Sequence, residues 1–170
     1  MTLQDRCINI ALSYLGVREN PPKSNRGPDV DRFIRVGGGL TPEGSHYAWC
    51  ASFVSDVVVE AFTRKDGGFI DGLGPPQFKG SPAALGLLHK NPGLRIKKPE
   101  AGCIFVMDHG AGKGHTGFVV AVMPDGVHLH TIEGNTGPGP AAPAKDREGD
   151  GVYERFDRQI VDCCGFLRIG

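Results

Sequence analysis

A chain of 170 residues is long enough to bury one core without disulfide or metal staples, so we expect a single domain spanning residues 1–170. Nineteen basic and nineteen acidic residues cancel, which gives no reason to expect nucleic acid or an anionic membrane surface as a partner. No segment approaches the roughly 18 apolar residues of a membrane helix, and residues 1–6 lack the apolar core of a signal peptide. We therefore expect a chain made in the cytoplasm, without membrane insertion.

Glycine, proline and cysteine usage narrows the fold class. The 26 glycines and 13 prolines exceed average usage and favour a turn-rich α+β domain over a helical bundle. The five cysteines are odd in number and lack the paired spacing of metal ligands, so neither a disulfide framework nor a zinc ribbon is indicated. We expect these cysteines to be reduced thiols.

Helical periodicity dominates the first 63 residues. Apolar spacing predicts a short amphipathic helix over residues 3–15 and a second over 29–36, which the glycine run 37–39 stops. Between them, the prolines and glycine of residues 19–28 predict an ordered, extended loop that can line a groove. A third and central helix is predicted to begin near Trp49 and to run to about residue 63.

The third predicted helix carries Cys50 in its first turn. Apolar residues recur three, four, seven and eight positions further on, which makes one helix face a core stripe. The polar side chains are expected on the other side or its borders, at Ser52, Ser55, Asp56 and Glu60. Because a thiol in the first turn lies near the positive end of the helix dipole, Cys50 is a candidate nucleophile. The alternative is a buried cysteine that acts as a small hydrophobe.

The second half of the chain is predicted to form a sheet. Residues 69–98 are the least readable part, with one short helix expected over 83–89. Short apolar or alternating runs then predict strands, over 103–107, 115–122, 127–132, 152–156 and 165–169. Residues 138–151 form a glycine, proline and charge-rich segment that we expect to be an exposed loop. Helices followed by four or five antiparallel strands indicate an α+β fold with segregated elements.

A cysteine nucleophile needs a base, and the base needs a polar group that fixes its ring. His115 stands at the start of a predicted strand between glycine-rich segments, which allow close approach of backbone and substrate. The next strand ends in Glu133, Gly134 and Asn135. If these two strands pair, a carboxylate or amide can accept the imidazole N–H and direct the other ring nitrogen toward the thiol. Taken singly, Glu133 and Asn135 also fit a surface turn.

Three segments together resemble the CHAP family, the cysteine, histidine-dependent amidohydrolases/peptidases. They are Trp49-Cys50-Ala51-Ser52-Phe53-Val54, Gly114-His115-Thr116-Gly117-Phe118-Val119 and Glu133-Gly134-Asn135-Thr136. The resemblance extends to the closing segments 151–152 and 165–168, and the loop 19–28 is similar to that of phage-related members. It implies a papain-like fold, with N-terminal helices packed on a four- to five-stranded antiparallel sheet, and cleavage of amide or peptide bonds in peptidoglycan.

The resemblance also implies roles for individual residues. Cys50 is the nucleophile, His115 the base, Glu133 the group that orients the base and Asn135 a further polar member, so that Glu133 and Asn135 remain alternatives as the orienting group. Backbone N–H groups, that of Cys50 among them, would hold the oxyanion. No metal or cofactor is implied. Substrate-binding residues are expected at Tyr47, Trp49 and Asn25, with core packing as the alternative for Trp49.

Two other chemical sites compete with this one. His109 beside Asp108 is a rival base, although adjacent residues of a strand point to opposite faces and Asp108 could orient it only awkwardly. A metal site could collect His128, His130 and Cys163 or Cys164, because alternate strand residues share a face. Neither CxxC nor HExxH spacing supports that site.

Other functions share the same pattern. The chain could be a non-catalytic module that binds cell-wall peptide, or a cysteine protease or deamidase of the same fold that acts on a protein. As a hydrolase it fits a phage-type lysin, a tail-associated enzyme or a secreted antibacterial toxin, acting on the cell wall after delivery or lysis. We expect a monomer with peptidoglycan as its partner, and an immunity protein that plugs the groove if the protein is a toxin.

Overall fold

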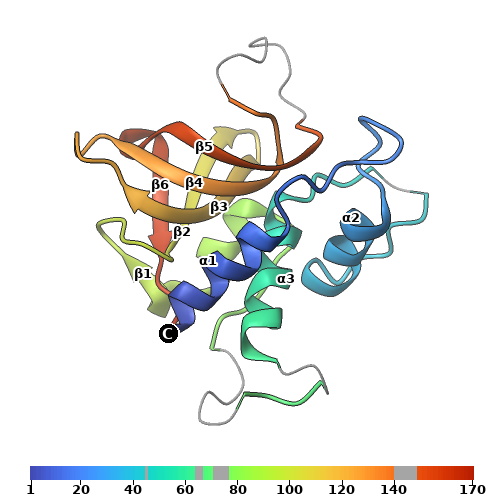
Figure 1. Ribbon diagram of the computed structural model, residues 1–170, viewed down its shortest axis with the longest axis horizontal. Coiled ribbons are helices and arrows are strands. Elements are labelled where there is room, and N and C mark those ends of the chain that lie inside the picture. The colour runs from blue at the N-terminus through green and yellow to red at the C-terminus, as the bar shows by residue number, and fades with distance from the viewer. Residues whose placement is uncertain (45, 64–66, 71–76, 140–148) are drawn as a thin grey trace.

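Four α-helices and a six-stranded antiparallel sheet form the described part of the chain, as Figure 1 shows for the computed structural model. The structure describes residues 1–44, 46–63, 67–70, 77–139 and 149–170. Most of the predicted loop 138–151 therefore lies outside the described residues. The α+β class predicted from the sequence is confirmed.

The helices lie close to where periodicity placed them. In chain order they are α1 (Leu3–Ser13), α2 (Pro28–Arg32), α3 (Cys50–Phe62) and α4 (Ala84–Lys90). A π-helical turn, η1 (Phe33–Gly37), continues α2, and short 3₁₀ turns occupy Pro92–Leu94 (η2) and Ile160–Asp162 (η3). None of the helices in the described ranges is long and apolar enough to cross a membrane.

The sheet has one strand more than the four or five predicted. Its strands run in the spatial order β1-β6-β2-β3-β4-β5. Their bounds are Arg95–Ile96 (β1), Ile104–Gly110 (β2), Lys113–Val122 (β3), His128–Thr136 (β4), Gly151–Gln159 (β5) and Cys163–Leu167 (β6). The additional strand is β1, which has only two residues and pairs with the end of β6. So short a strand leaves no alternating pattern in the sequence.

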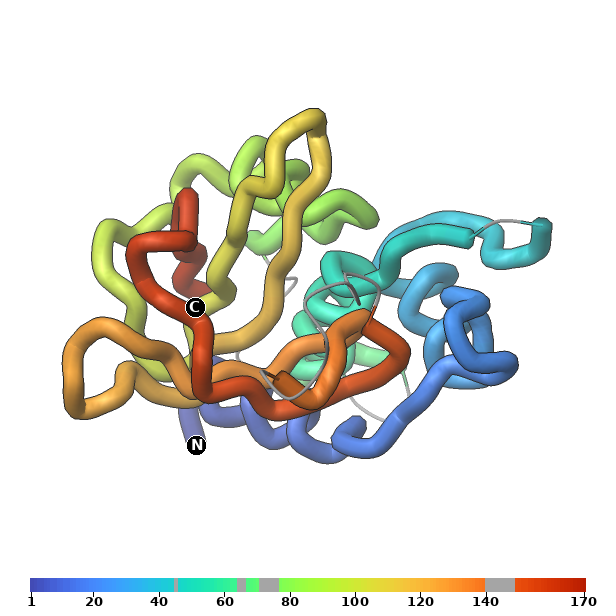
Figure 2. The backbone as a smooth tube through the Cα atoms, turned by 90° about the horizontal axis from the view of Figure 1, so that it is seen from above, coloured from blue at the N-terminus to red at the C-terminus, as the bar shows by residue number. Residues whose placement is uncertain are grey.

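Two hydrophobic clusters occupy the two faces of the sheet. The larger joins α1, α3 and α4 to side chains such as Phe118 and Ile132, and the smaller lies around Phe105, Val119 and Leu129. Strands gather on one side of the molecule and α2 lies on the other, with α3 between them (Figure 2). Because α3 is covered from both sides, its N-terminus is held where the two parts meet.

The polar side of α3 is mostly buried. Ser52, Ser55 and Asp56 are fully buried, and only Glu60 is partly exposed. Ser55 Oγ bonds the backbone of Ser81, and the carboxylate of Asp56 lies 3.0 Å from Arg32. These side chains are buried because a second helical layer, α2 and η1, covers the side of α3 that faces away from the sheet.

Close backbone packing explains why the first residue of the run 37–39 is a glycine. A Cβ added at Gly37 would lie 2.0 Å from the backbone oxygen of Ser52 and 2.5 Å from the backbone nitrogen of Asp56. These atoms belong to the middle of α3 and cannot move independently of the helix. Gly37 therefore allows η1 to pack directly on the helix that carries Cys50, in addition to ending the preceding helix.

We predict that Gly37→Ala lowers the free energy of unfolding by about 2 to 4 kcal/mol, because the new methyl group overpacks the contact between η1 and α3. Gly93→Ala is the control, since no atom lies within 4 Å of a Cβ built there. Chemical denaturation followed by the fluorescence of Trp49, the single tryptophan, measures both. Equal stability of the two variants would contradict the prediction.

Candidate active site

Cys50 is the first residue of α3 and is nearly buried, with 5% of its surface exposed. Trp49 is the N-cap residue, and no side chain of the described residues caps this helix end. The first backbone N–H groups of a helix have no partner within the helix. An anion at the mouth of α3 would therefore meet both these groups and the positive end of the helix dipole.

The remaining thiols are poor candidates for a nucleophile. Burial raises the pKa of Cys7 and of Cys163 to about 12 and that of Cys103 to about 11. Burial also raises the pKa of Cys164, on the exposed side of β6. These four thiols are protonated at neutral pH, and only the thiolate is nucleophilic.

His115, on β3, connects the thiol to Glu133. Its Nε2 lies 2.7 Å from Oε2 of Glu133, on the neighbouring strand β4, and its ring also interacts with the side chain of Cys50. Because Glu133 occupies Nε2, Nδ1 is the ring nitrogen that remains for the thiol. The predicted pairing of the two strands is confirmed by the register, in which Phe118 lies opposite Ile132.

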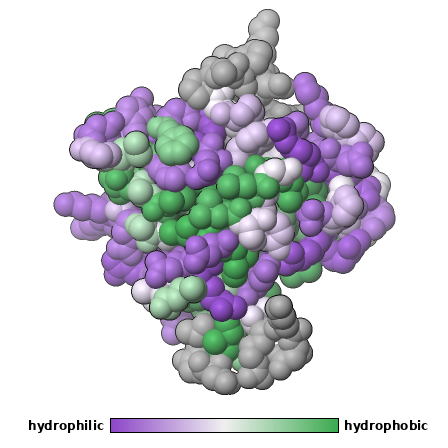
Figure 3. Space-filling model, viewed as in Figure 1, coloured by the Kyte–Doolittle hydropathy of each residue, from purple (hydrophilic) through white to green (hydrophobic). Residues whose placement is uncertain are grey.

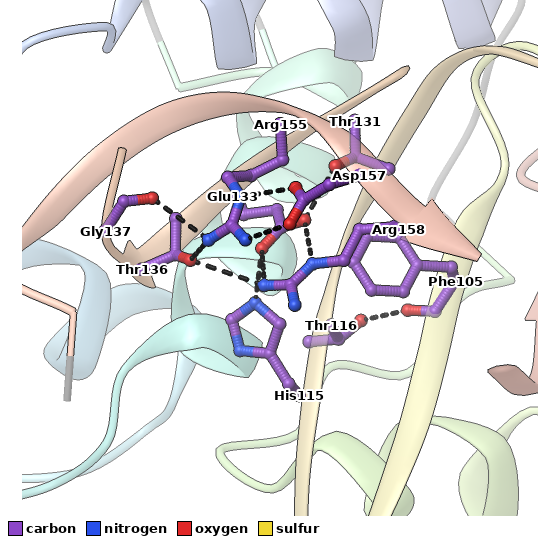
Figure 4. A network of polar contacts seen from close by, with 10 residues as sticks. All are labelled: Phe105, His115, Thr116, Thr131, Glu133, Thr136, Gly137, Arg155, Asp157 and Arg158. Atoms are coloured by element: carbon purple, nitrogen blue, oxygen red, sulfur yellow. Dashed lines mark hydrogen bonds and ion pairs between the residues drawn. The ribbon is translucent and has the colours of Figure 1, made fainter. Parts of the chain in front are cut away.

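Glu133 is completely buried and has four close polar contacts (Figure 4). Arg158 of β5 donates from Nε to Oε1 at 2.8 Å and from Nη2 to Oε2 at 2.6 Å. Thr131 donates its hydroxyl to Oε1 at 2.6 Å, and His115 occupies Oε2. Burial raises the pKa of the Glu133 carboxyl, but the hydrogen bonds and charges of Arg158 and His115 outweigh it and hold that pKa below its usual range.

A glycine in β3 makes room for the Glu133 side chain. A Cβ at Gly117 would lie 2.8 Å from Cγ of Glu133 and 2.7 Å from the backbone oxygen of Ile132. Gly117 follows two residues after His115 and therefore lies on the same face of the strand. The glycine beside the histidine thus lets the carboxylate reach across β3 to the ring.

The charge state of His115 follows from these contacts. Burial lowers the pKa of the imidazole, but the negative charge of Glu133 and the hydrogen bonds to Cys50 and Glu133 dominate and raise it to about 9. The ring is therefore an imidazolium at neutral pH.

Asn135 serves the cysteine side of the site and does not contact the histidine. With its carboxamide oriented to satisfy both neighbours, the oxygen accepts the backbone N–H of Trp49 at 3.1 Å and the nitrogen donates to the Gly149 carbonyl at 2.9 Å. Asn135 adopts a left-handed backbone conformation, with φ of 55°. Of the two residues left open by the sequence, Glu133 is the one that contacts the His115 ring, and Asn135 contacts Trp49, the residue before Cys50.

Trp49 lies in the core, so its proposed place in the substrate groove is not supported. Its side chain has no exposed surface, stacks on Phe33 and donates its indole N–H to the buried carboxylate of Glu19 at 2.9 Å. The second oxygen of Glu19 accepts the backbone N–H of Asn25 at 3.0 Å. Trp49 thus connects α3 to the loop 19–28. This position agrees with core packing, the alternative to substrate binding that the sequence left open for Trp49.

The other two residues expected to bind substrate remain accessible. Tyr47 is half-buried two residues before Trp49, and Asn25 is half-buried in the loop, where it adopts φ of 53°. The carbonyl of Ser24 lies 2.9 Å from Nδ1 of His46. This contact places the loop beside the segment that leads into α3, and a role of Tyr47 and Asn25 in binding stays a prediction.

The competing sites are less well formed. Asp108 and His109 lie in the exposed end of β2, where Asp108 accepts the backbone N–H of Gly110. His128 and His130 have separate carboxylate partners, Asp125 at 2.6 Å and Glu154 at 2.8 Å. Within the described residues no group of three histidine, cysteine or acidic side chains is arranged to hold a metal ion.

We predict that wild-type stability falls by up to about 3 kcal/mol as the pH rises from 6.5 through about 9. A histidine whose pKa is raised by folding stabilises the protein fully below its unfolded value of 6.5, and this contribution is lost as the ring deprotonates in the folded state. Urea denaturation across this range, compared with His115→Gln, isolates the effect because other groups titrate in both proteins. Parallel pH profiles would contradict the assignment.

A second prediction concerns Trp49. We expect Trp49→Phe to lower the free energy of unfolding by about 2 kcal/mol, because the buried Glu19 carboxylate loses its indole donor. If Trp49 does not contact substrate, KM stays unchanged. The matched variant Glu19→Gln keeps an acceptor for the indole and should cost less. A raised KM with unchanged stability would instead indicate that Trp49 contacts the substrate.

Comparison with known proteins agrees with this geometry. The family model described as the CHAP domain matches residues 42–135, which is more than half of the chain and includes Cys50, His115, Glu133 and Asn135. No curated protein and no solved structure matches the chain. The fold is consistent with the papain-like arrangement that the sequence resemblance implies. The chain belongs to the CHAP domain family, a family of peptidoglycan amidohydrolases and peptidases.

Proposed function

We propose that this protein hydrolyses an amide or peptide bond of peptidoglycan through a thioester on Cys50. The observation that carries the proposal is the contact of Cys50, at the uncapped end of α3, with an imidazolium held by a buried carboxylate. A non-catalytic binding module has no use for this arrangement, since binding requires neither a thiol nor an oriented base.

The reaction begins with the Cys50 thiolate and the His115 imidazolium. The thiolate attacks the scissile carbonyl carbon, and the negative charge moves to the carbonyl oxygen, which the free N–H groups at the start of α3 stabilise. His115 then gives its proton to the leaving nitrogen, the carbon–nitrogen bond breaks and the amine departs. A thioester on Cys50 remains.

Hydrolysis of the thioester restores the starting state. Neutral His115 takes a proton from water, whose oxygen attacks the thioester carbon. The carbon–sulfur bond breaks, the carboxylic acid product leaves and Cys50 is again a thiolate next to an imidazolium. Glu133 remains ionised throughout and keeps the ring in position, as the buried carboxylate does in the serine protease triad.

The substrate lies, in this proposal, between the loop 19–28 and the segment before α3. Asn25 and Tyr47 are its proposed contacts, because both keep accessible surface and the contact of His46 with Ser24 joins their two segments. Tyr47 also precedes Cys50 by three residues in the sequence, and we propose its hydroxyl as a further donor to the oxyanion. Whether the bond lies at the lactyl end or between peptide residues depends on what this groove accepts.

The biological setting follows the same proposal. An enzyme of this kind reaches the cell wall after delivery or lysis, as a lysin or as an antibacterial toxin, and in the second case an immunity protein would fill the groove. We propose that it acts as a monomer. The alternative is a cysteine protease or deamidase of the same fold acting on a protein, since thiol, base and oxyanion site are common to these reactions.

We predict that Cys50→Ala abolishes release of fragments from purified peptidoglycan, with a loss of about 10³-fold or more in kcat, because the thioester cannot form without the Cys50 thiol. Cys164→Ala is the control, since it removes an exposed thiol from β6. Mass analysis of the fragments identifies the bond: new lactyl ends indicate an amidase, and new peptide termini indicate an endopeptidase. Undiminished digestion by folded Cys50→Ala would refute the thioester mechanism.

A further inference from the structure

Arg158 lies on β5, beyond the segment that the family model matches, and no sequence motif pointed to it. We propose that Arg158 is a positioning residue of this active site: it holds the Glu133 carboxylate in its orientation toward His115 and balances the charge of the Cys50 thiolate. The inference rests on the proposed role of Cys50 as the nucleophile.

Geometry gives the first argument. Both guanidinium contacts to Glu133 are short, 2.8 and 2.6 Å, and they form a fork that engages both carboxylate oxygens. With Thr131 on Oε1 and His115 on Oε2, the carboxylate cannot rotate without breaking a charge-assisted bond. The direction of the His115 ring is therefore set by Glu133, and the direction of Glu133 is set by Arg158.

Charge gives the second argument. The reactive state contains a thiolate, an imidazolium and a carboxylate, which together carry one negative charge in a largely buried place. The Arg158 guanidinium brings that sum to zero, and only 20% of its side chain is exposed. Removing the cation would destabilise the thiolate form of Cys50 more than the thiol form, because the site with the thiolate carries more negative charge. A buried carboxylate without a cation would also tend toward its neutral form.

The neighbouring titratable groups do not replace Arg158. Those that act on this set of residues are Asp157 on β5 and Cys163 at the start of β6, in addition to Cys50 and His115. Asp157 is occupied by the fork of Arg155, at 2.8 and 2.6 Å. In the described structure Arg158 is thus the cation that contacts Glu133 apart from His115 itself.

A bulge in β5 explains how this strand supplies the arginine. Leu129 pairs with Arg158, whereas Thr131 pairs with Arg155, so three steps on β5 match two on β4. Without the irregularity, residues 155 and 158 would point to opposite faces of the sheet. With it, both guanidinium groups lie on the face of Thr131 and Glu133, where Figure 4 shows them side by side.

The test uses a reaction of the thiol that needs no substrate. Cys50 is alkylated with iodoacetamide over a range of pH, and the labelled peptide is quantified by mass spectrometry. We expect Arg158→Met to move the pH of half-maximal alkylation upward by about one unit, which slows labelling about tenfold at pH values below the wild-type midpoint. Arg155→Met, which breaks an equally good fork on the same strand, should leave the profile near that of the wild type.

Arg158→Lys separates charge from orientation. A lysine restores the positive charge as a point donor and cannot engage both carboxylate oxygens. We expect its alkylation profile to shift by less than half as much as that of Arg158→Met. In peptidoglycan digestion we expect kcat to fall about tenfold with KM unchanged, because the ring of His115 is less well held.

Two results would overturn the proposal. One is a folded Arg158→Met protein with a wild-type alkylation profile; if that variant does not fold, the other is Arg158→Lys with both a wild-type profile and wild-type turnover. Failure of the proposed function is a separate outcome, since it shows as an absence of peptidoglycan cleavage by the wild type. The alkylation series decides the role of Arg158 in either case.

Discussion

The ion pair between the buried Glu133 carboxylate and His115 is the interaction on which the site depends. A carboxylate without exposed surface would be neutral unless cations and donors surround it, and here Arg158, Thr131 and His115 do so. Its negative charge raises the pKa of His115 to about 9 against the opposing effect of burial. The strands β3, β4 and β5 each contribute one of the three charged groups, His115, Glu133 and Arg158, so the sheet has to form before the charges are in place.

The second constraint is the immobility of α3. The helix is packed against the sheet on one side and against η1 on the other, where Gly37 allows backbone contact. Trp49, the residue that precedes Cys50, is fixed by two hydrogen bonds. Its indole donates to Glu19, and its backbone N–H donates to Asn135. A thiol held in this way keeps its distance to His115 while one end of the helix stays open to an anion. Packing and reactivity therefore depend on the same residues.

Local patterns were sufficient to predict the main helices, five of the strands and the sequence order of Cys50, His115 and Glu133. The two-residue strand β1 carries no periodic signal, and the burial of Ser52 and Asp56 depends on a layer that periodicity within α3 cannot reveal. Trp49 could be core or groove until its partner Glu19, thirty residues away, was located. Arg158 was missed because the strand predicted over 152–156 ends before it, and because a bulge, which a strict alternation of faces does not anticipate, turns it toward Glu133.

The most direct test is the titration of the His115 ring by NMR in the wild type and in Glu133→Gln, which keeps the shape of the side chain and removes its charge. We predict a midpoint near pH 9 in the wild type. In the variant the midpoint should fall toward the ordinary value of about 6.5, because Cys50 alone then opposes the effect of burial. Equal midpoints in the two proteins would contradict the central claim that Glu133 keeps the His115 imidazole charged.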